Sequence, residues 1–242
     1  MGTALVRPRA ILFDYGGTLV EELEYNPRAG IEALLARAVY RETPVSVDTV
    51  LQRAERISAE IVERRDRFQI EAPWGSLTRL IHDHFGTCFD EPLAELELAF
   101  WNASVRTRAM PGAEAALRES HRLGYPMGVV SNSSFGQRVI RHELGKHGLA
   151  DHLATIVVSA EYVVRKPNPL LFEMGASLLG ADPADVWFVG DRLDTDIKGA
   201  RSAGMTAIWY APNQEERSDD AHHIARGWSS FVDLLRAAVG SA

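Results

Sequence analysis

Asp14 is the first residue in this chain whose type and position point to chemistry. It directly follows the apolar run Ala10–Phe13, and Gly16, Gly17 and Thr18 come close behind it. A carboxylate at the end of a buried segment is costly unless a cation or hydrogen-bond donors balance its charge. Such a carboxylate could act as a nucleophile whose charge is held by a metal ion and a lysine. The alternative interpretation is an aspartate that caps a helix or closes a turn.

Two short polar segments could bind an anion. Gly16 and Gly17 allow a tight turn in which backbone N–H groups hold a phosphate. Ser131 and Asn132 follow a second apolar run and precede a predicted helix, where a hydroxyl and free N–H groups form an anion site. A plain glycine loop and simple N-capping are the alternatives.

A lysine and a group of carboxylates complete the set of reactive side chains. Lys166 is one of three lysines in the chain and stands directly before a proline at the predicted start of a helix. Its ammonium group could neutralise a carboxylate and a phosphoryl oxygen together, although most lysines are surface residues. Asp191, Asp194 and Asp196 place three carboxylates within six residues after another apolar run. Oxygen ligands at this density suit a hard cation such as Mg²⁺, and an acidic turn is the alternative.

Apolar runs that alternate with helical patterns must position these side chains. The expected strands are Ala10–Asp14, Pro126–Val130, Thr155–Ser159, Val186–Val189 and Thr206–Tyr210, and the expected helices are 110–123, 135–144, one beginning at 166–169, 197–203 and 230–239. This alternation predicts an α/β fold, with a Rossmann-like parallel sheet covered by helices on both faces. Ligands bind at the carboxyl ends of the strands in such sheets. Asp14, Ser131 and Asp191 each end an expected strand, so we expect them to converge at one edge of the sheet.

Residues 21–108 show only helical periodicity. Apolar residues recur at helical spacing in the stretches Ile31–Ala38, Val50–Val62 and Leu93–Phe100, and no convincing strand interrupts them. The sequence therefore predicts two domains, an α/β core of residues 1–19 and 109–242 and a helical domain of residues 20–108 inserted into it.

Charge and cysteine content narrow the choice of partners. The net charge of -7 gives no electrostatic reason to expect nucleic acid. The single cysteine, Cys88, allows no intramolecular disulfide, which suits a reducing cytoplasm. The apolar run Ala10–Phe13 is too short for a signal peptide or a membrane span. We therefore expect a cytoplasmic protein without a nucleic-acid or membrane partner, and the sequence leaves its oligomeric state open.

Taken in order, these residues resemble the motifs of the haloacid dehalogenase superfamily of hydrolases. The resemblance covers the segments 8–20 and 108–212 and includes four ordered motifs: Asp14 to Thr18, Ser131-Asn132, Lys166-Pro167, and Gly190-Asp191 with Asp196. It implies that the helical insert is the family's cap, placed between the first and second motifs.

The resemblance also implies a function, that of a Mg²⁺-dependent phosphatase acting on a small phosphorylated metabolite. Asp14 would attack phosphorus to form an aspartyl-phosphate, which water then hydrolyses. Mg²⁺ would be held by the side chains of Asp14 and Asp191 and by the backbone carbonyl of Gly16. Asp196 would support the metal site or Lys166, with Asp194 as the alternative candidate. The phosphoryl group would be positioned by Thr18, Ser131, the Asn132 backbone and Lys166.

The chain departs from the pattern at Gly16, where phosphatases of the family have a second aspartate that protonates the leaving group and later activates water. Loss of a general acid/base typically costs about 10²–10⁴-fold in rate. One interpretation is a phosphatase that is weakened or takes its acid from elsewhere. The candidates for that acid are Glu21, Glu22, His82 and His84, each of which could instead be a plain surface residue.

Two further interpretations accompany the first. Phosphonatases and dehalogenases of the family also lack the second aspartate. The former use a cap lysine, and residues 21–108 contain none. The latter lack a metal and have a different fourth motif, so the retained Asp191 and Asp196 disfavour them. The last interpretation is a non-catalytic relative that binds a phosphate ligand or a protein partner.

Overall fold

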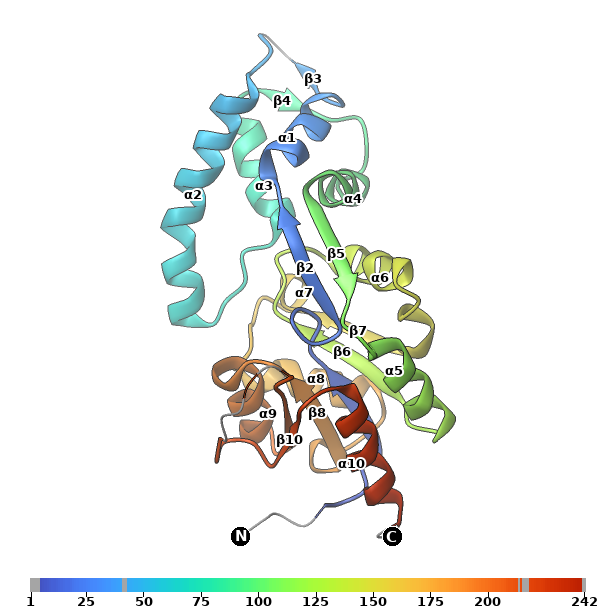
Figure 1. Cartoon of the computed structure of the whole chain (residues 1–242). Helices are drawn as coiled ribbons and strands as arrows, with labels where there is room; N and C mark the ends of the chain where they lie inside the picture. Colours follow the sequence, from blue (N-terminus) through green and yellow to red (C-terminus); the bar gives the residue numbers. More distant parts are fainter. Residues whose placement is uncertain (1–4, 41–42, 213, 215–217, 241–242) are drawn as a thin grey trace.

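The computed structural model describes residues 5–40, 43–212, 214 and 218–240, and its centre is a parallel sheet (Figure 1). Within these residues the sheet has six strands in the order β10-β9-β8-β1-β6-β7. Their bounds are β1 Ala10–Phe13, β6 Met127–Ser131, β7 Thr155–Val158, β8 Val186–Gly190, β9 Thr206–Tyr210 and β10 His223–Ala225. The predicted Rossmann-like α/β fold is confirmed, and so are the five expected strands. The sixth, β10, was not predicted because it is only three residues long and begins with a histidine.

Strand β1 occupies the middle of the sheet because it is apolar on both faces. All four of its residues are fully buried, as is typical of a parallel strand covered by helices on each side. It pairs with β6 and β8, so Phe13 lies beside Val129 and Val189. All three strands end at, or within two residues after, these paired positions. Asp14 follows at once, and its N–H donates to the carbonyl of Val189 at 2.9 Å.

Helices cover both faces of the sheet, as expected. Alternate residues of β1 contact opposite layers, with Ile11 and Phe13 on one side and Leu12 on the other. The first layer contains α5 (Ala113–Arg122), α6 (Gln137–Lys146) and α10 (Trp228–Gly240), and the second contains α8 (Pro169–Leu178) and α9 (Lys198–Ser202). A short helix, α7 (Ser159–Tyr162), follows β7 directly.

The segment between β1 and β6 adds a second body of helices, which lies beyond one end of the sheet in Figure 1. Its helices are α1 (Pro27–Leu35), α2 (Val47–Phe68), α3 (Trp74–His84) and α4 (Leu93–Ser104). They pack around an apolar cluster of their own, which includes Leu34, Val50, Trp74 and Phe100. The three stretches of helical periodicity thus fall on α1, α2 and α4, whereas α3 was not recognised separately.

The expectation that residues 21–108 contain no strand was wrong. Strands β2 (Val20–Tyr25) and β5 (Val105–Ala109) form an antiparallel pair between the helical body and the sheet, and β3 (Val39–Tyr40) pairs with β4 (Thr87–Cys88). Half of the residues of β2 are glutamates, and its sequence lacks the regular alternation of a half-buried strand. Its stability comes from cross-strand partners some 80 residues away, including the ion pair between Glu21 and Arg108 at 2.6 Å.

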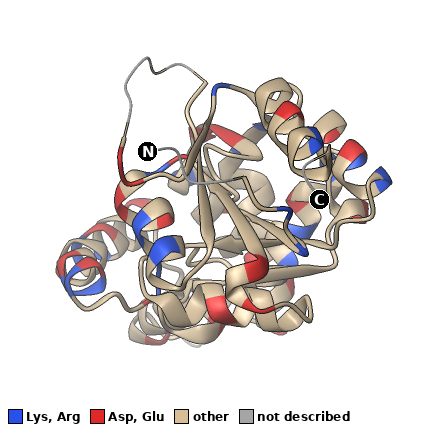
Figure 2. Cartoon of the chain, turned by 90° about the horizontal axis from the view of Figure 1, so that it is seen from below, with Lys and Arg blue, Asp and Glu red and all other residues tan. Residues whose placement is uncertain are grey.

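This strand pair begins and ends at the predicted domain boundaries. Strand β2 starts at Val20 and β5 ends at Ala109. The division into a core of 1–19 and 109–242 and a cap of 20–108 stays a prediction, and its extremes, residues 1–4 and 241–242, lie outside the described part of the chain. Among the described helices, none combines the length and the apolar character that a membrane span requires. Lysine and arginine are interspersed with aspartate and glutamate over the face shown in Figure 2.

Candidate active site

Three carboxylates meet at the carboxyl edge of the sheet. Asp14 follows β1, Asp191 follows β8, and Asp196 lies in the π-helical turn Leu193–Ile197 that comes after β8. One oxygen from each lies within 4.8 Å of the others. The adjacency of β1 and β8 therefore brings Asp14 and Asp191 together, and one ion could contact both.

Lys166 lies against two of these carboxylates. Its Nζ is 2.5 Å from Oδ1 of Asp14 and 2.7 Å from Oδ1 of Asp196, and it donates to the carbonyl of Val130 at 2.9 Å. The lysine is 4% exposed, so its charge is held by these partners and not by water. Asp194, the alternative to Asp196, forms an exposed ion pair with Arg192 at 3.0 Å instead.

The electrostatics of the cluster favour an added cation. Burial raises the pKa of Asp14, and the neighbouring Asp196 and Asp191 raise it further, while Lys166 opposes the change. Burial, together with Asp196, raises the pKa of Asp191 to about 6. Three carboxylates with one ammonium group leave a net negative charge in a buried place, which is why ionisation is disfavoured there. The cluster is thus a buried acidic group that could bind a metal ion.

The turn after Asp14 has one position that needs glycine and one that does not. Gly17 has φ +77°, and a Cβ there would lie 2.5 Å from Oδ2 of Asp191. At Gly16 a Cβ would meet no atom within 4 Å, and φ lies outside the left-handed range. Thr18 is fully buried and donates to Oδ1 of Asp191 at 3.4 Å. Thr18 therefore contacts the acidic cluster, and its direct contact with a phosphoryl group stays a prediction.

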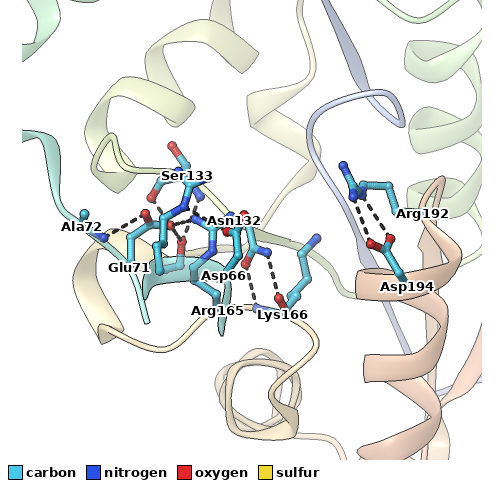
Figure 3. Close-up of polar contacts among 11 residues, drawn as sticks. Asp66, Glu71, Ala72, Asn132, Ser133, Arg165, Lys166, Arg192 and Asp194 are labelled. Carbon is cyan, nitrogen blue, oxygen red and sulfur yellow. Dashed lines mark hydrogen bonds and ion pairs between the residues drawn. The ribbon is translucent and has the colours of Figure 1, made fainter. Parts of the chain in front are cut away.

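The Ser-Asn segment differs from expectation in two ways. The Asn132 side chain holds the main chain of Lys166, donating to its carbonyl at 3.0 Å and accepting from its N–H at 2.7 Å (Figure 3). The expected binding of a phosphoryl group by Ser131 and the Asn132 backbone stays a prediction, but the first N–H groups of the following helix are not free to contribute to it. Helix α6 begins several residues later, and the Glu97 and Glu161 carboxylates already accept from the N–H groups of Gly136 and Gln137.

A cavity of about 720 Å³ opens over Asp14 and Lys166. Its lining joins Ser131, Asn132 and the backbone turn at Gly16 to residues that sequence reasoning did not select: Arg65, Asp66, Gln69, Trp101, Thr107, Arg165 and Arg192. Several of these lie at the exposed end of α2 or on β5. In the sequence, a polar side chain at such a position looks the same as one that only faces solvent. No local pattern in the sequence marked them.

The four candidates for the missing acid differ in whether they line the cavity. Glu22 is the one of the four that lines it, and partial burial raises the pKa of this otherwise exposed side chain. Glu21 points to Arg108 on the other face of the strand pair. His82 is buried against Phe89, and burial lowers its pKa to about 4. His84 contacts the ring of Phe85. The two histidines therefore pack inside or on the helical body.

Comparison with known proteins defines the class to which this fold and site belong. The family model of haloacid dehalogenase-like hydrolases matches residues 8–204, so the chain belongs to that family. The phosphoserine phosphatase of Thermus thermophilus is 34% identical over 134 residues, which are 54% of this chain and 53% of that protein. A phosphoglycolate phosphatase of Neisseria meningitidis is 28% identical over 219 residues, 86% of this chain and 82% of that protein.

Solved structures share the fold at lower identity. A phosphatase of this superfamily from Thermococcus onnurineus has a TM-score of 0.59 and 22% identity, covering 94% of this chain and 97% of that one. A 2-haloacid dehalogenase from Pseudomonas syringae has a TM-score of 0.64 and 21% identity, covering 96% and 99%. The chain spans only about half the length of several curated relatives that it matches, 53% and 48% in two cases.

Proposed function

We propose that this protein is a Mg²⁺-dependent phosphatase that transfers a phosphoryl group from a small phosphorylated molecule to Asp14 and then to water. The observation that carries the proposal is the contact between Lys166 and Asp14 beside Asp191 and Asp196, at the floor of a cavity. The relatives named as phosphatases of phosphoserine and phosphoglycolate support this class of reaction.

The residues present suit magnesium. Carboxylate and carbonyl oxygens are its preferred protein ligands, and the cluster carries more negative charge than Lys166 balances. Asp14 and Asp191 would hold the ion through their side chains and Gly16 through its backbone carbonyl, with Asp196 beside them. When bound, Mg²⁺ supplies positive charge that stabilises the phosphoryl oxygens.

The protein groups divide the remaining work. An oxygen of Asp14 forms a bond to phosphorus while the bond from phosphorus to the ester oxygen breaks. Water then attacks phosphorus, which releases phosphate and restores the Asp14 carboxylate. Lys166, fixed by Asn132, holds a cation beside the reacting atoms, and the Ser131 hydroxyl lies at the cavity wall. In phosphoryl transfer, positioning and charge stabilisation of this kind account for most of the catalysis.

One proton must reach the leaving oxygen, and one must leave the attacking water. Gly16 can do neither. We assign both transfers to Glu22, the cavity-lining candidate. On β2 it pairs with Thr107 of β5, which lines the same cavity, so this face of the strand pair is directed at the site. The second candidate function is a phosphate-binding relative with little turnover, and the absence of a carboxylate at position 16 favours it.

Turnover distinguishes these functions. We expect release of phosphate from an aryl phosphate such as p-nitrophenyl phosphate, with strict dependence on Mg²⁺ and loss of activity after chelation. A 2-haloacid should release no halide. Hydrolysis that persists in a chelator, or binding of phosphate with no turnover of any ester, would contradict the proposal.

Magnesium affinity should depend on Asp191. Asp191→Asn removes one charged oxygen ligand, so titration calorimetry should show binding weaker by about tenfold or more. Asp194→Asn is the matched control, because Asp194 lies in the same loop but forms an exposed pair with Arg192. Equal affinities for the two variants would place the ion elsewhere.

The stabilisation by magnesium should increase with pH. The pKa values of Asp14 and Asp191 are raised, so the metal-free folded state holds protons that the unfolded chain has released. Its stability therefore falls as pH rises from about 4 to the folded-state pKa of Asp191, about 6. Mg²⁺ binds the ionised carboxylates, so the Mg²⁺-induced rise in Tm should be larger at about pH 8 than at about pH 5.5. Thermal unfolding at both pH values, with and without MgCl₂ and with Asp191→Asn as control, measures this. A rise independent of pH would contradict the assignment of the site.

A further inference from the structure

The segment between α2 and α3 is paired with the loop that leads to Lys166. Ile70 of this linker, which we define as residues 69–73, forms an antiparallel bridge with Val164. The N–H of Glu71 donates to the carbonyl of Val163, and the N–H of Arg165 donates to the carbonyl of Gln69 at 2.8 Å. The helical body and the loop between α7 and α8 thus form a short two-stranded contact beside the cavity.

The side chain of Glu71 completes this contact. Its carboxylate is fully buried, with one oxygen accepting from the N–H of Ala72 at 3.0 Å. The other oxygen accepts from Ser159 Oγ at 2.5 Å and from the guanidinium of Arg165 (Figure 3). A buried carboxylate with all its partners in place is tightly fixed, and removing its charge leaves Arg165 with the longer ion pair to the exposed Asp66 at 3.9 Å.

The loop that Glu71 holds is strained. Val163 is a β-branched residue with φ 67°, a conformation that such residues rarely adopt. Strain of this kind persists only where surrounding contacts impose it, and it gathers at functional sites. The contacts that impose it here come from the linker, since the carbonyl of Val163 accepts from Glu71.

The strained loop ends at the lysine of the active site. Arg165 is the residue before Lys166, and the Lys166 main chain is held on its other side by Asn132. Lys166 Nζ reaches Asp14 at 2.5 Å. The end of α2 that precedes the linker also places Arg65 and Asp66 in the cavity wall. The contact between the linker and the Val163–Arg165 loop therefore fixes both the wall of the cavity and the position of Lys166.

We propose that Glu71 is a positioning residue, which holds the Val163–Arg165 loop and thereby places Lys166 against Asp14. This inference rests on the proposed phosphatase function. It adds that the linker from the helical body is needed for chemistry and not only for enclosing the substrate. Glu71 itself is fully buried and is not among the residues that line the cavity.

Glu71→Gln tests the proposal, because it keeps the shape of the side chain and removes the charge that holds Arg165. We expect kcat with p-nitrophenyl phosphate to fall by about tenfold or more with KM little changed, since small misplacement of a catalytic group is costly. The matched control is Glu95→Gln. It breaks the exposed contact of α4 with α6, between Glu95 and Arg138 at 2.6 Å, away from the lysine loop. The control should keep the wild-type kcat.

A second readout does not depend on turnover. Amide hydrogen exchange of Val163 to Lys166 should quicken in Glu71→Gln, with unchanged exchange in the strands of the sheet and no change in Glu95→Gln. If the wild type hydrolyses no ester, the phosphatase proposal fails, and this exchange measurement still decides whether Glu71 positions the loop. Wild-type kcat together with wild-type exchange in a folded Glu71→Gln protein would overturn the inference.

A double variant separates positioning from loss of stability. In Glu71→Gln with Arg165→Met the largely buried guanidinium that has lost its close counter-ion is gone, so Tm should recover toward the wild-type value. We expect kcat to stay low, because the loop has still lost its anchor. Recovery of kcat along with Tm would show that the single variant was slow only because it was unstable, and would overturn the positioning role.

Discussion

Asp14→Asn should lower kcat for phosphate release by about 10⁴-fold or more, the scale seen when a catalytic nucleophile is removed. An amide oxygen is a poor nucleophile and carries no charge to pair with Lys166. Steady-state kinetics over a range of enzyme concentrations would measure the loss. A trapped phosphoryl group, detected by mass spectrometry after quenching with acid, should appear on the wild type and be absent from the variant.

The same variant should be no less stable than the wild type. Burial and the two neighbouring carboxylates raise the pKa of Asp14, so its ionised form is unfavourable in the metal-free protein. Removing that charge should leave Tm unchanged or higher without Mg²⁺, and should remove most of the rise that Mg²⁺ gives the wild type. An inactive variant that has also lost its fold would give no support to a nucleophile, whereas a stable variant with wild-type turnover would rule Asp14 out.

The sequence predicted the residues of the acidic cluster because they follow two apolar strands, Asp14 after β1 and both Asp191 and Asp196 after β8. Asp14 and Asp191 stand directly after apolar runs, and the parallel order of strands then brings those ends to one edge. The five main strands were found for the same reason. Local periodicity is sufficient when an element is apolar along its whole length, as β1 and β8 are.

The features that were missed depend on partners far away in the chain. Three of the six residues of strand β2 are glutamates, and only pairing with β5 makes it a strand. The Asn132 side chain was assigned no role, because its hydrogen bonds run to a main chain 34 residues further on. Glu71 looks like any charged residue in a loop until the fold buries it against Arg165 and Ser159. A single sequence contains no local sign of such contacts.

Gly16→Asp is the second change with a large expected effect, because it restores a carboxylate at the position where phosphatases of the family have their acid. Space and backbone both permit it, since a Cβ at position 16 meets no atom within 4 Å and φ is not left-handed. Turnover of alkyl phosphates should rise toward the roughly 10²–10⁴-fold scale of general acid/base catalysis. Aryl phosphates, whose leaving groups depart readily as anions, should gain much less. Gly17→Ala is the contrasting variant, because its Cβ would collide with Asp191 and its φ is +77°.

Glu22→Gln shows whether a residue of the strand pair already supplies part of this chemistry. Glu22 lines the cavity but extends from a largely exposed strand, so we expect it to be a less efficient acid than an aspartate fixed in the turn. In the wild-type background Glu22→Gln should lower alkyl phosphate turnover by about tenfold or more. In the Gly16→Asp background the same change should have little effect, because the new aspartate then transfers the protons. If the wild type hydrolyses alkyl phosphates rapidly and neither variant alters the rate, both the assignment of Glu22 and the importance of the gap at Gly16 are wrong.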